Sequence, residues 1–354
     1  MLTPRNIDQV IAALPKVHAD ILPAPTYEKP DRQSKGIALA VESMSKHVSN
    51  EGFQVFQGLE YAGYKLYGYN IPEGNTTDVK EILRREPSAT SVVVNDEREW
   101  NFDPRNYREK NAKFIGIEEL AQRKDLFIGT ILKDAQQRTA FHRDSAQRMG
   151  AHFWVIHYHP RIVKHLATYV RVPHLIRTYH TVDKDDVPSY SAKDRHGCLL
   201  SGFIWPCYPL RQRLFREVDK LPDTMTLQHP GYSRNGCHTP NYLNLLSKFQ
   251  VAICTSSIYS YAVRKIIEAT AAGCMVITDL ALDDALPYID SNLTRIHPNT
   301  PTAEIAELIK TLCRKYDPKV QQEYTEKALE FYDFRVSGLR LSQDIENLRL
   351  DYRV

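Results

Sequence analysis

The sequence predicts an α/β fold with two domains, each built on a parallel sheet. Short apolar runs that end in Pro, Gly, Asn or Asp alternate with amphipathic helical patterns from about residue 20 to residue 300, as they do in βαβ units. The 354 residues exceed the roughly 250 to 300 residues that a single hydrophobic core accommodates. A charged, Pro-containing stretch at residues 183–196 interrupts the alternation and suits an interdomain linker.

The first half of the chain alternates between expected strands and helices. A strand that runs into a loop is predicted at residues 20–25, and the apolar residues spaced helically from Ile37 to Val48 predict a helix after the connection at residues 25–36. Further strands are predicted at residues 90–96, 126–132, 152–160 and 174–180. Each of these strands ends in polar side chains that can carry chemistry.

The second half repeats the pattern after the linker. The alternation restarts at residues 197–202, and strands are predicted at residues 250–257 and 275–278 with a helix at 263–273 between them. Helices are predicted from Thr302 onward and over residues 320–350. We therefore place an N-terminal domain at residues 1–190, a C-terminal domain at residues 191–335, and a terminal helix at residues 336–354 that can pack back on the N-terminal domain.

Composition and charge exclude several classes of protein. The 42% hydrophobic and 25% charged residues exclude collagen-like, low-complexity and disordered chains. A net charge of +3 is too close to balance to indicate a nucleic-acid partner. The six cysteines form no C-x-x-C pair, so they predict neither a zinc cluster nor a redox motif.

The chain lacks the signals of membrane insertion or secretion. No apolar run approaches the roughly 18 residues that are needed to span a bilayer. Residues 1–14 have neither the basic start nor the continuous apolar core of a secretory signal. We expect the protein in the cytoplasm, or in the host cytoplasm if it is viral.

The most informative segment is KIIEATAAGCMVITDL at residues 265–280. It reads as a helix, a tight turn at Gly273 and a strand, and Gly273 fits a position where φ is positive. Glu268 lies on the helix five residues before this turn, behind a strand that ends in Ser256 and Ser257. In parallel sheets ligands bind outside the carboxyl ends of the strands, so these residues are functional candidates.

The E-A-x-A-x-G pattern at residues 268–273 resembles the nucleotide-sugar-binding domain of GT-B glycosyltransferases. The segment CLLSGFIWPCYPLRQRLF at residues 198–215 and the later H-P-G-Y at residues 229–232 are similar to CgeB-like and group 1 glycosyltransferase-like proteins. The resemblance covers about residues 175–290. It implies a GT-B-like architecture of two Rossmann-like domains whose parallel sheets face a central cleft.

The resemblance implies a set of residues that bind the nucleotide sugar donor: Ser201, Gly202, Arg211, His229, Tyr232, Ser256, Ser257, Lys265 and Glu268. Glu268 would bind the ribose hydroxyls. The N-terminus of its helix and the basic side chains would face the diphosphate. The pattern is incomplete, because many such enzymes carry a second Glu at the place of Ser260. Two structural interpretations stay open, a solvated helix face for Arg211 and an aromatic core role for His229 and Tyr232.

The transfer of a sugar to a hydroxyl requires a general base. Asp96 is the first candidate because it follows the strand residues VVVN, and Glu97 is its neighbour and rival. His180, with His157 and His159, forms a second set at strand ends. Asp96 can instead cap a turn, and each histidine can instead be a hydrogen-bonded structural residue.

These observations predict a glycosyltransferase that uses a nucleotide diphosphate sugar, by preference a UDP-sugar, as co-substrate. No metal and no cofactor are expected, because the H-x-H at 157–159 has no adjacent carboxylate or cysteine and basic groups can take the charge of the leaving diphosphate. The acceptor is a sugar, a protein, a small molecule or a hydroxymethylated base of DNA. A non-catalytic sugar-nucleotide-binding or coat-assembly protein would fit the same residues, and so would a GT-B-fold epimerase or hydrolase.

Overall fold

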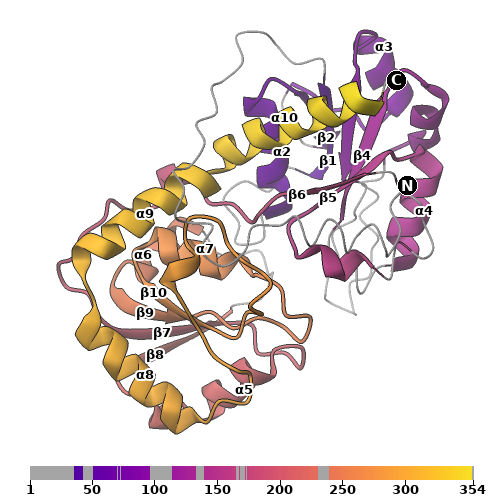
Figure 1. Ribbon diagram of the computed structural model, residues 1–354. Coiled ribbons are helices and arrows are strands. Elements are labelled where there is room, and N and C mark those ends of the chain that lie inside the picture. Colours follow the sequence, from indigo (N-terminus) through magenta and orange to yellow (C-terminus); the bar gives the residue numbers. More distant parts are fainter. Residues whose placement is uncertain are drawn as a thin grey trace.

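The computed structural model contains two parallel sheets, each in its own α/β unit (Figure 1). It describes residues 36–42, 51–69, 71, 73–95, 114–132, 139–164, 167, 172, 174–229 and 239–352. The first sheet has the strand order β2-β1-β3-β4-β5-β6 and the second has the order β11-β10-β9-β7-β8. All the strand pairs are parallel. The two-unit α/β architecture predicted from the sequence is therefore confirmed.

The strands of the first sheet are β1 (Gly36–Glu42), β2 (Lys65–Tyr69), β3 (Ser91–Asn95), β4 (Phe127–Leu132), β5 (Phe153–Ile156) and β6 (His174–Arg177). The strands of the second sheet are β7 (His196–Gly202), β8 (Thr224–Gln228), β9 (Phe249–Ile253), β10 (Met275–Thr278) and β11 (Leu293–Arg295).

The α-helices are α2 (Glu51–Tyr61), α3 (Val79–Arg85), α4 (Thr139–Met149), α5 (Pro209–Arg216), α6 (Thr239–Leu246), α7 (Arg264–Ala271), α8 (Thr302–Lys315), α9 (Pro318–Tyr332) and α10 (Phe334–Tyr352). Short 3₁₀-helices lie at Ile117–Gln122, Pro160–Val163, Lys184–Asp186, Val218–Lys220 and Asp290–Asn292. None of the helices in the described ranges is both long and apolar enough to cross a membrane.

Most strands in the described ranges occur where the sequence predicts them, because a parallel strand covered on both faces reads as a continuous apolar run. All five residues of β3 and all six of β4 are buried. The helix predicted from Ile37 to Val48 is wrong at its start, because residues 36–42 form strand β1 between β2 and β3. A run as short as Ile-Ala-Leu-Ala is compatible with the spacing of a helix and with that of a strand. Its residues are buried on both faces of the sheet, which favours the strand.

The two terminal helices connect the units. Helix α9 packs on α7 of the second unit, and α10 crosses to α2 of the first unit, as the yellow ribbon in Figure 1 shows. Gly58 of α2 and Gly338 of α10 lie so close that a Cβ added to Gly338 would overlap the backbone of Gly58. Leu341 and Ile345 of α10 are buried in the core of the first unit. The C-terminal helix thus belongs to the core of the unit that comes first in the chain.

Candidate functional site

Two cationic side chains converge at the carboxyl end of β7. Gly202 ends this strand with φ at +133°, and a Cβ added there would lie 2.5 Å from Nζ of Lys265 and 2.7 Å from Nη1 of Arg211. Only a glycine therefore leaves room for both cations beside the backbone. The site combines the end of β7 with the helices that follow β7 and β9.

Arg211 lies in the first turn of α5 and is buried, so it is not on a solvated helix face. Its Nε donates to Oγ1 of Thr255 at 2.9 Å and its Nη2 donates to the carbonyl of Thr255 at 2.9 Å. Its Nη1 donates to the carbonyl of Phe203 at 3.1 Å, and its guanidinium stacks 3.9 Å from the ring centroid of Tyr208. Burial lowers the pKa of Arg211.

Lys265 is the second residue of α7 and is partly buried, with Nζ 5.9 Å from the ring centroid of Tyr242. Burial and the adjacent Arg211 lower the pKa of this lysine to about 7. Among the described residues neither Lys265 nor Arg211 forms an ion pair with a carboxylate. Helix α7 also begins without a side-chain cap at Val263. Glu268 and Asp279 therefore act on these two cations only through space, and no described carboxylate contacts them directly.

The serines that the sequence singled out fix the loops around these cations. The hydroxyls of Ser201 and Tyr242 share a hydrogen bond of 2.7 Å. The backbone N–H of Ser256 donates to Oδ1 of Asp279 at 2.5 Å, and Oγ of Ser257 accepts from the N–H of Tyr259 at 3.2 Å. Burial raises the pKa of Asp279. Asp279 was missed by the sequence analysis, although its place directly after the strand Met275–Thr278 is the signal that could have found it.

Glu268 is buried within α7 and faces Arg264 of the same helix. Oε1 of Glu268 lies 2.9 Å from Nε of Arg264, one helical turn earlier. The sequence analysis missed this arginine, which the i, i+4 spacing indicates. The role of Glu268 as the ribose ligand stays a prediction.

The remaining sequence candidates divide into described and undescribed residues. The N–H of His229 donates to the carbonyl of Gly202 at 3.1 Å, and its ring lies edge-on to Phe203 with the centroids 6.1 Å apart. His229 therefore adjoins Arg211 and Lys265, which we call the cation pair. Asp96, Glu97 and Tyr232 lie outside the described residues, so their predicted roles stay predictions.

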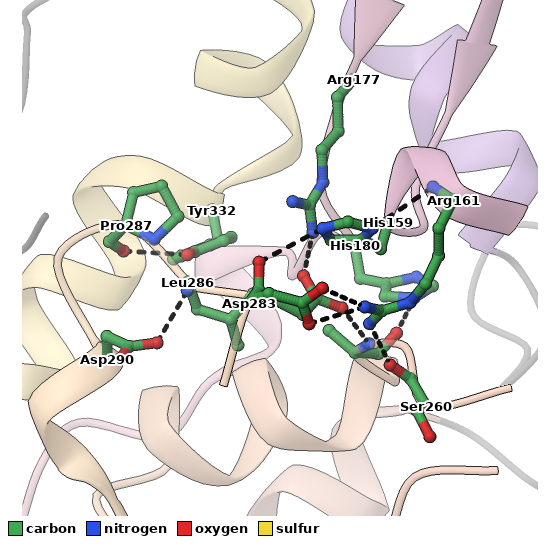
Figure 2. Close-up of polar contacts among 12 residues, drawn as sticks. His159, Arg161, Arg177, His180, Ser260, Asp283, Leu286, Pro287, Asp290 and Tyr332 are labelled. Atoms are coloured by element: carbon green, nitrogen blue, oxygen red, sulfur yellow. Dashed lines mark hydrogen bonds and ion pairs between the residues drawn. The ribbon is translucent and has the colours of Figure 1, made fainter. Parts of the chain in front are cut away.

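The carboxyl edges of the two sheets meet in a polar contact (Figure 2). Arg177 at the end of β6 pairs with Oδ1 of Asp284, which follows β10, and their side chains are only 4% and 0% exposed. Oδ2 of Asp284 accepts from the N–H of Ala262 at 2.8 Å. Nη1 of Arg161 contacts both carboxylate oxygens of Asp283. The two sheets therefore face each other across this contact.

Two of the strand-end histidines take part in the same contact. Nδ1 of His159 accepts from the N–H of Arg161, and Nε2 donates to the carbonyl of Asp283 at 3.2 Å. Burial lowers the pKa of His159 to about 4, so the ring is neutral and both of its nitrogens are bonded. His180 is buried, donates from Nε2 to the carbonyl of Ala262 at 3.0 Å and stacks on His157. The geometry gives His159 a structural role, and the catalytic role of His180 stays a prediction.

Comparison with known proteins identifies this architecture. No family model matches the sequence, and no curated protein matches it. The structure is similar to sucrose-phosphate synthase from Thermosynechococcus elongatus, with a TM-score of 0.54 and 11% identity over 90% of this chain and 100% of that chain. The chain has the GT-B fold. A glycosyltransferase from Rickettsia africae is also similar, with a TM-score of 0.52 and 10% identity over 90% of this chain and 99% of that chain.

In this GT-B fold the cation pair and the interdomain contact lie on neighbouring loops. Lys265 follows β9 on α7, whereas Ser260 and Ala262, three to five residues earlier, are bonded to residues of the first unit. In the part of the chain that the structure describes, no group of three or more His, Cys, Asp or Glu residues is arranged to hold a metal ion. The chemistry that the described residues offer is anion binding at the carboxyl end of β7.

Proposed function

We propose that the protein is a glycosyltransferase that moves a sugar from a nucleotide diphosphate sugar, by preference a UDP-sugar, to an acceptor hydroxyl in the cytoplasm without a metal ion. One observation carries the proposal: Arg211 and Lys265 converge over Gly202 and have no carboxylate partner among the described residues. A diphosphate supplies the negative charge that this pair lacks. The GT-B fold adds support at the level of architecture alone.

The roles of the donor-site residues follow from the hydrogen-bond donors that they leave unused within the protein. Arg211 uses one N–H of each of its three nitrogens within the protein, which leaves two of its five donors for a phosphate oxygen. Lys265 contributes a compact ammonium at the start of α7. When the bond between the sugar and the diphosphate breaks, charge develops on the leaving diphosphate, and these groups stabilise that charge in place. Glu268 binds the ribose, oriented by Arg264.

The acceptor side completes the reaction. A general base takes the proton of the acceptor hydroxyl as that oxygen attacks the anomeric carbon. Asp96 is the proposed base because it follows β3, and a strand-end histidine is its rival. The acceptor is a sugar, a protein, a small molecule or a hydroxymethylated base of DNA.

The proposal is tested by titration calorimetry with UDP, GDP, ADP and their sugar conjugates. We expect one base-selective set of nucleotides to bind, and Arg211→Met or Lys265→Met to weaken that binding at least tenfold. Arg213→Met is the matched control, because Arg213 lies on the same helix but donates to the carbonyls of Pro298 and Thr300. Failure of every nucleotide to bind, or equal losses in the control, would overturn the proposal.

A second candidate function is sugar-nucleotide binding without catalysis. Ser260 stands where the resemblance expects a second glutamate, and its carbonyl accepts from Nη2 of Arg161 at 2.6 Å. Mass spectrometry of the donor after incubation with a panel of acceptors separates the two candidates. Donor that binds but is never consumed, with or without acceptor, favours the binding protein.

A further inference from the structure

An aromatic surface borders the cation pair. Trp205 is 56% exposed, although one face of its ring stacks on Phe203 with the centroids 5.6 Å apart and the planes 19° apart. Ile258, which is 60% exposed, lies next to the same loop, because its N–H donates to the carbonyl of Cys207 at 2.8 Å. Large apolar side chains that gather in an exposed patch often mark a binding surface.

The surface is fixed to the same guanidinium that lies in the cation pair. The carbonyl of Phe203 accepts from Nη1 of Arg211, and the carbonyl of Trp205 accepts from the N–H of Tyr208 at 2.9 Å. Trp205 is three residues from Gly202, which an extended chain spans in about 11 Å. A ring attached to a diphosphate at the cations is therefore within reach of the indole.

Trp205 and His229 lie in loops that follow neighbouring strands. Strand β7, which Trp205 follows, lies between β8, which His229 follows, and β9, which Ile258 follows. Phe203 contacts both aromatic rings, Trp205 and His229. Cys207, two residues after Trp205, is bonded to Ile258 in the loop after β9, and the loops after β9 and β10 carry the contact with the first unit. The loop that carries Trp205 is therefore bonded to the loop after β9, which also reaches the first unit.

We propose that Trp205 is a sugar-binding residue whose open face stacks on the C–H face of a pyranose ring. This inference rests on the proposed function for the identity of the ring, which belongs to the donor sugar or to the acceptor. A pyranose combines an apolar face with a rim of hydroxyls, so an indole that is covered on one face and open on the other fits it. Phe203 supports the indole from its covered face.

Tryptophan fluorescence reads this contact directly. The chain has three tryptophans, of which Trp154 is fully buried, so a Trp100→Phe variant leaves Trp205 as the exposed reporter. UDP, UDP-hexoses and free methyl pyranosides are titrated separately, with acrylamide quenching as the readout. We expect protection of Trp205 by UDP-hexose if the ring is the donor sugar, or by a pyranoside alone if the ring belongs to the acceptor.

Substitutions supply the second readout. Trp205→Ala should weaken binding of the protecting sugar ligand about tenfold and leave UDP affinity unchanged, whereas Trp205→Tyr should retain most of the affinity. Met225→Ala, which removes an exposed apolar side chain from β8 of the same unit, is the control and should change neither. Protection by UDP as strong as that by UDP-hexose, or protection by no ring ligand, would overturn the inference. A failure of UDP, GDP and ADP alike to bind would overturn the proposed function, and the pyranoside titration still decides the role of Trp205.

Discussion

The buried ion pair between Arg177 and Asp284 should dominate the stability of the contact between the two units. Replacing Arg177 by Met removes the positive partner and leaves the Asp284 carboxylate, which is 0% exposed, with the N–H of Ala262 and no counter-charge from Arg177. Removal of one partner from a buried pair costs about 3 to 5 kcal/mol, because the remaining charge stays desolvated. The entropy of unfolding is about 2.1 cal/mol/K per residue, or roughly 0.7 kcal/mol/K for 354 residues, so the melting temperature should fall by roughly 4 to 7 °C.

Urea and thermal unfolding of three variants measure this cost. Arg177→Met should lose the full amount, whereas the double variant Arg177→Met with Asp284→Leu should recover most of it, because no unpaired charge remains. Arg148→Met is the control, since Arg148 pairs with Glu118 on the surface and such pairs contribute about 0 to 1 kcal/mol. The reasoning is refuted if Arg177→Met is no more destabilising than the control, or if the double variant is as unstable as the single one.

Three further predictions concern the cation pair and the terminal helix. UDP affinity should fall as the pH rises from 6.5 to 8.5, because Lys265, with a pKa of about 7, loses its charge in the empty site. The affinity should fall at most about tenfold per pH unit above this pKa. Calorimetry in two buffers should show proton uptake on binding, and an affinity that does not change with pH contradicts the prediction. Gly202→Ala should weaken UDP binding more than tenfold, whereas Gly116→Ala, also at positive φ but with open surroundings, should not; equal effects contradict the steric argument. Gly338→Ala should lower the free energy of unfolding by about 1 to 3 kcal/mol, because its methyl group meets Gly58, and an unchanged urea midpoint contradicts that packing.

More of the architecture than of the site could be predicted from the sequence. Strands such as Ser91–Asn95 and Met275–Thr278 are recognisable because their apolar runs end abruptly in polar residues. The strand Gly36–Glu42 was mistaken for a helix, because a run of small apolar residues satisfies both periods when its neighbours are unknown. The pairing of β1 with β2 and β3 resolves this ambiguity, and no local pattern encodes that pairing.

The site shows the same division between local and long-range information. Arg211 and Lys265 were recognisable as basic residues near strand ends, yet only the fold shows that they converge over Gly202. The pair of Arg177 and Asp284 joins residues 107 positions apart and depends on how the two units face each other. Such contacts leave no periodic trace in the sequence, so residue types alone did not predict them.

The contact between the units and the donor site share one short segment of chain. Ala262 is hydrogen-bonded through its N–H to Asp284 and through its carbonyl to His180. Lys265 follows three residues later, in the first turn of α7. A shift of the first unit therefore acts on the start of the helix that carries one of the two cations. If Arg177→Met loosens the contact, its UDP affinity should fall together with its stability, although Arg177 itself touches neither cation. Lost stability with unchanged UDP affinity would show that α7 is held by its own unit alone, through its packing on α9.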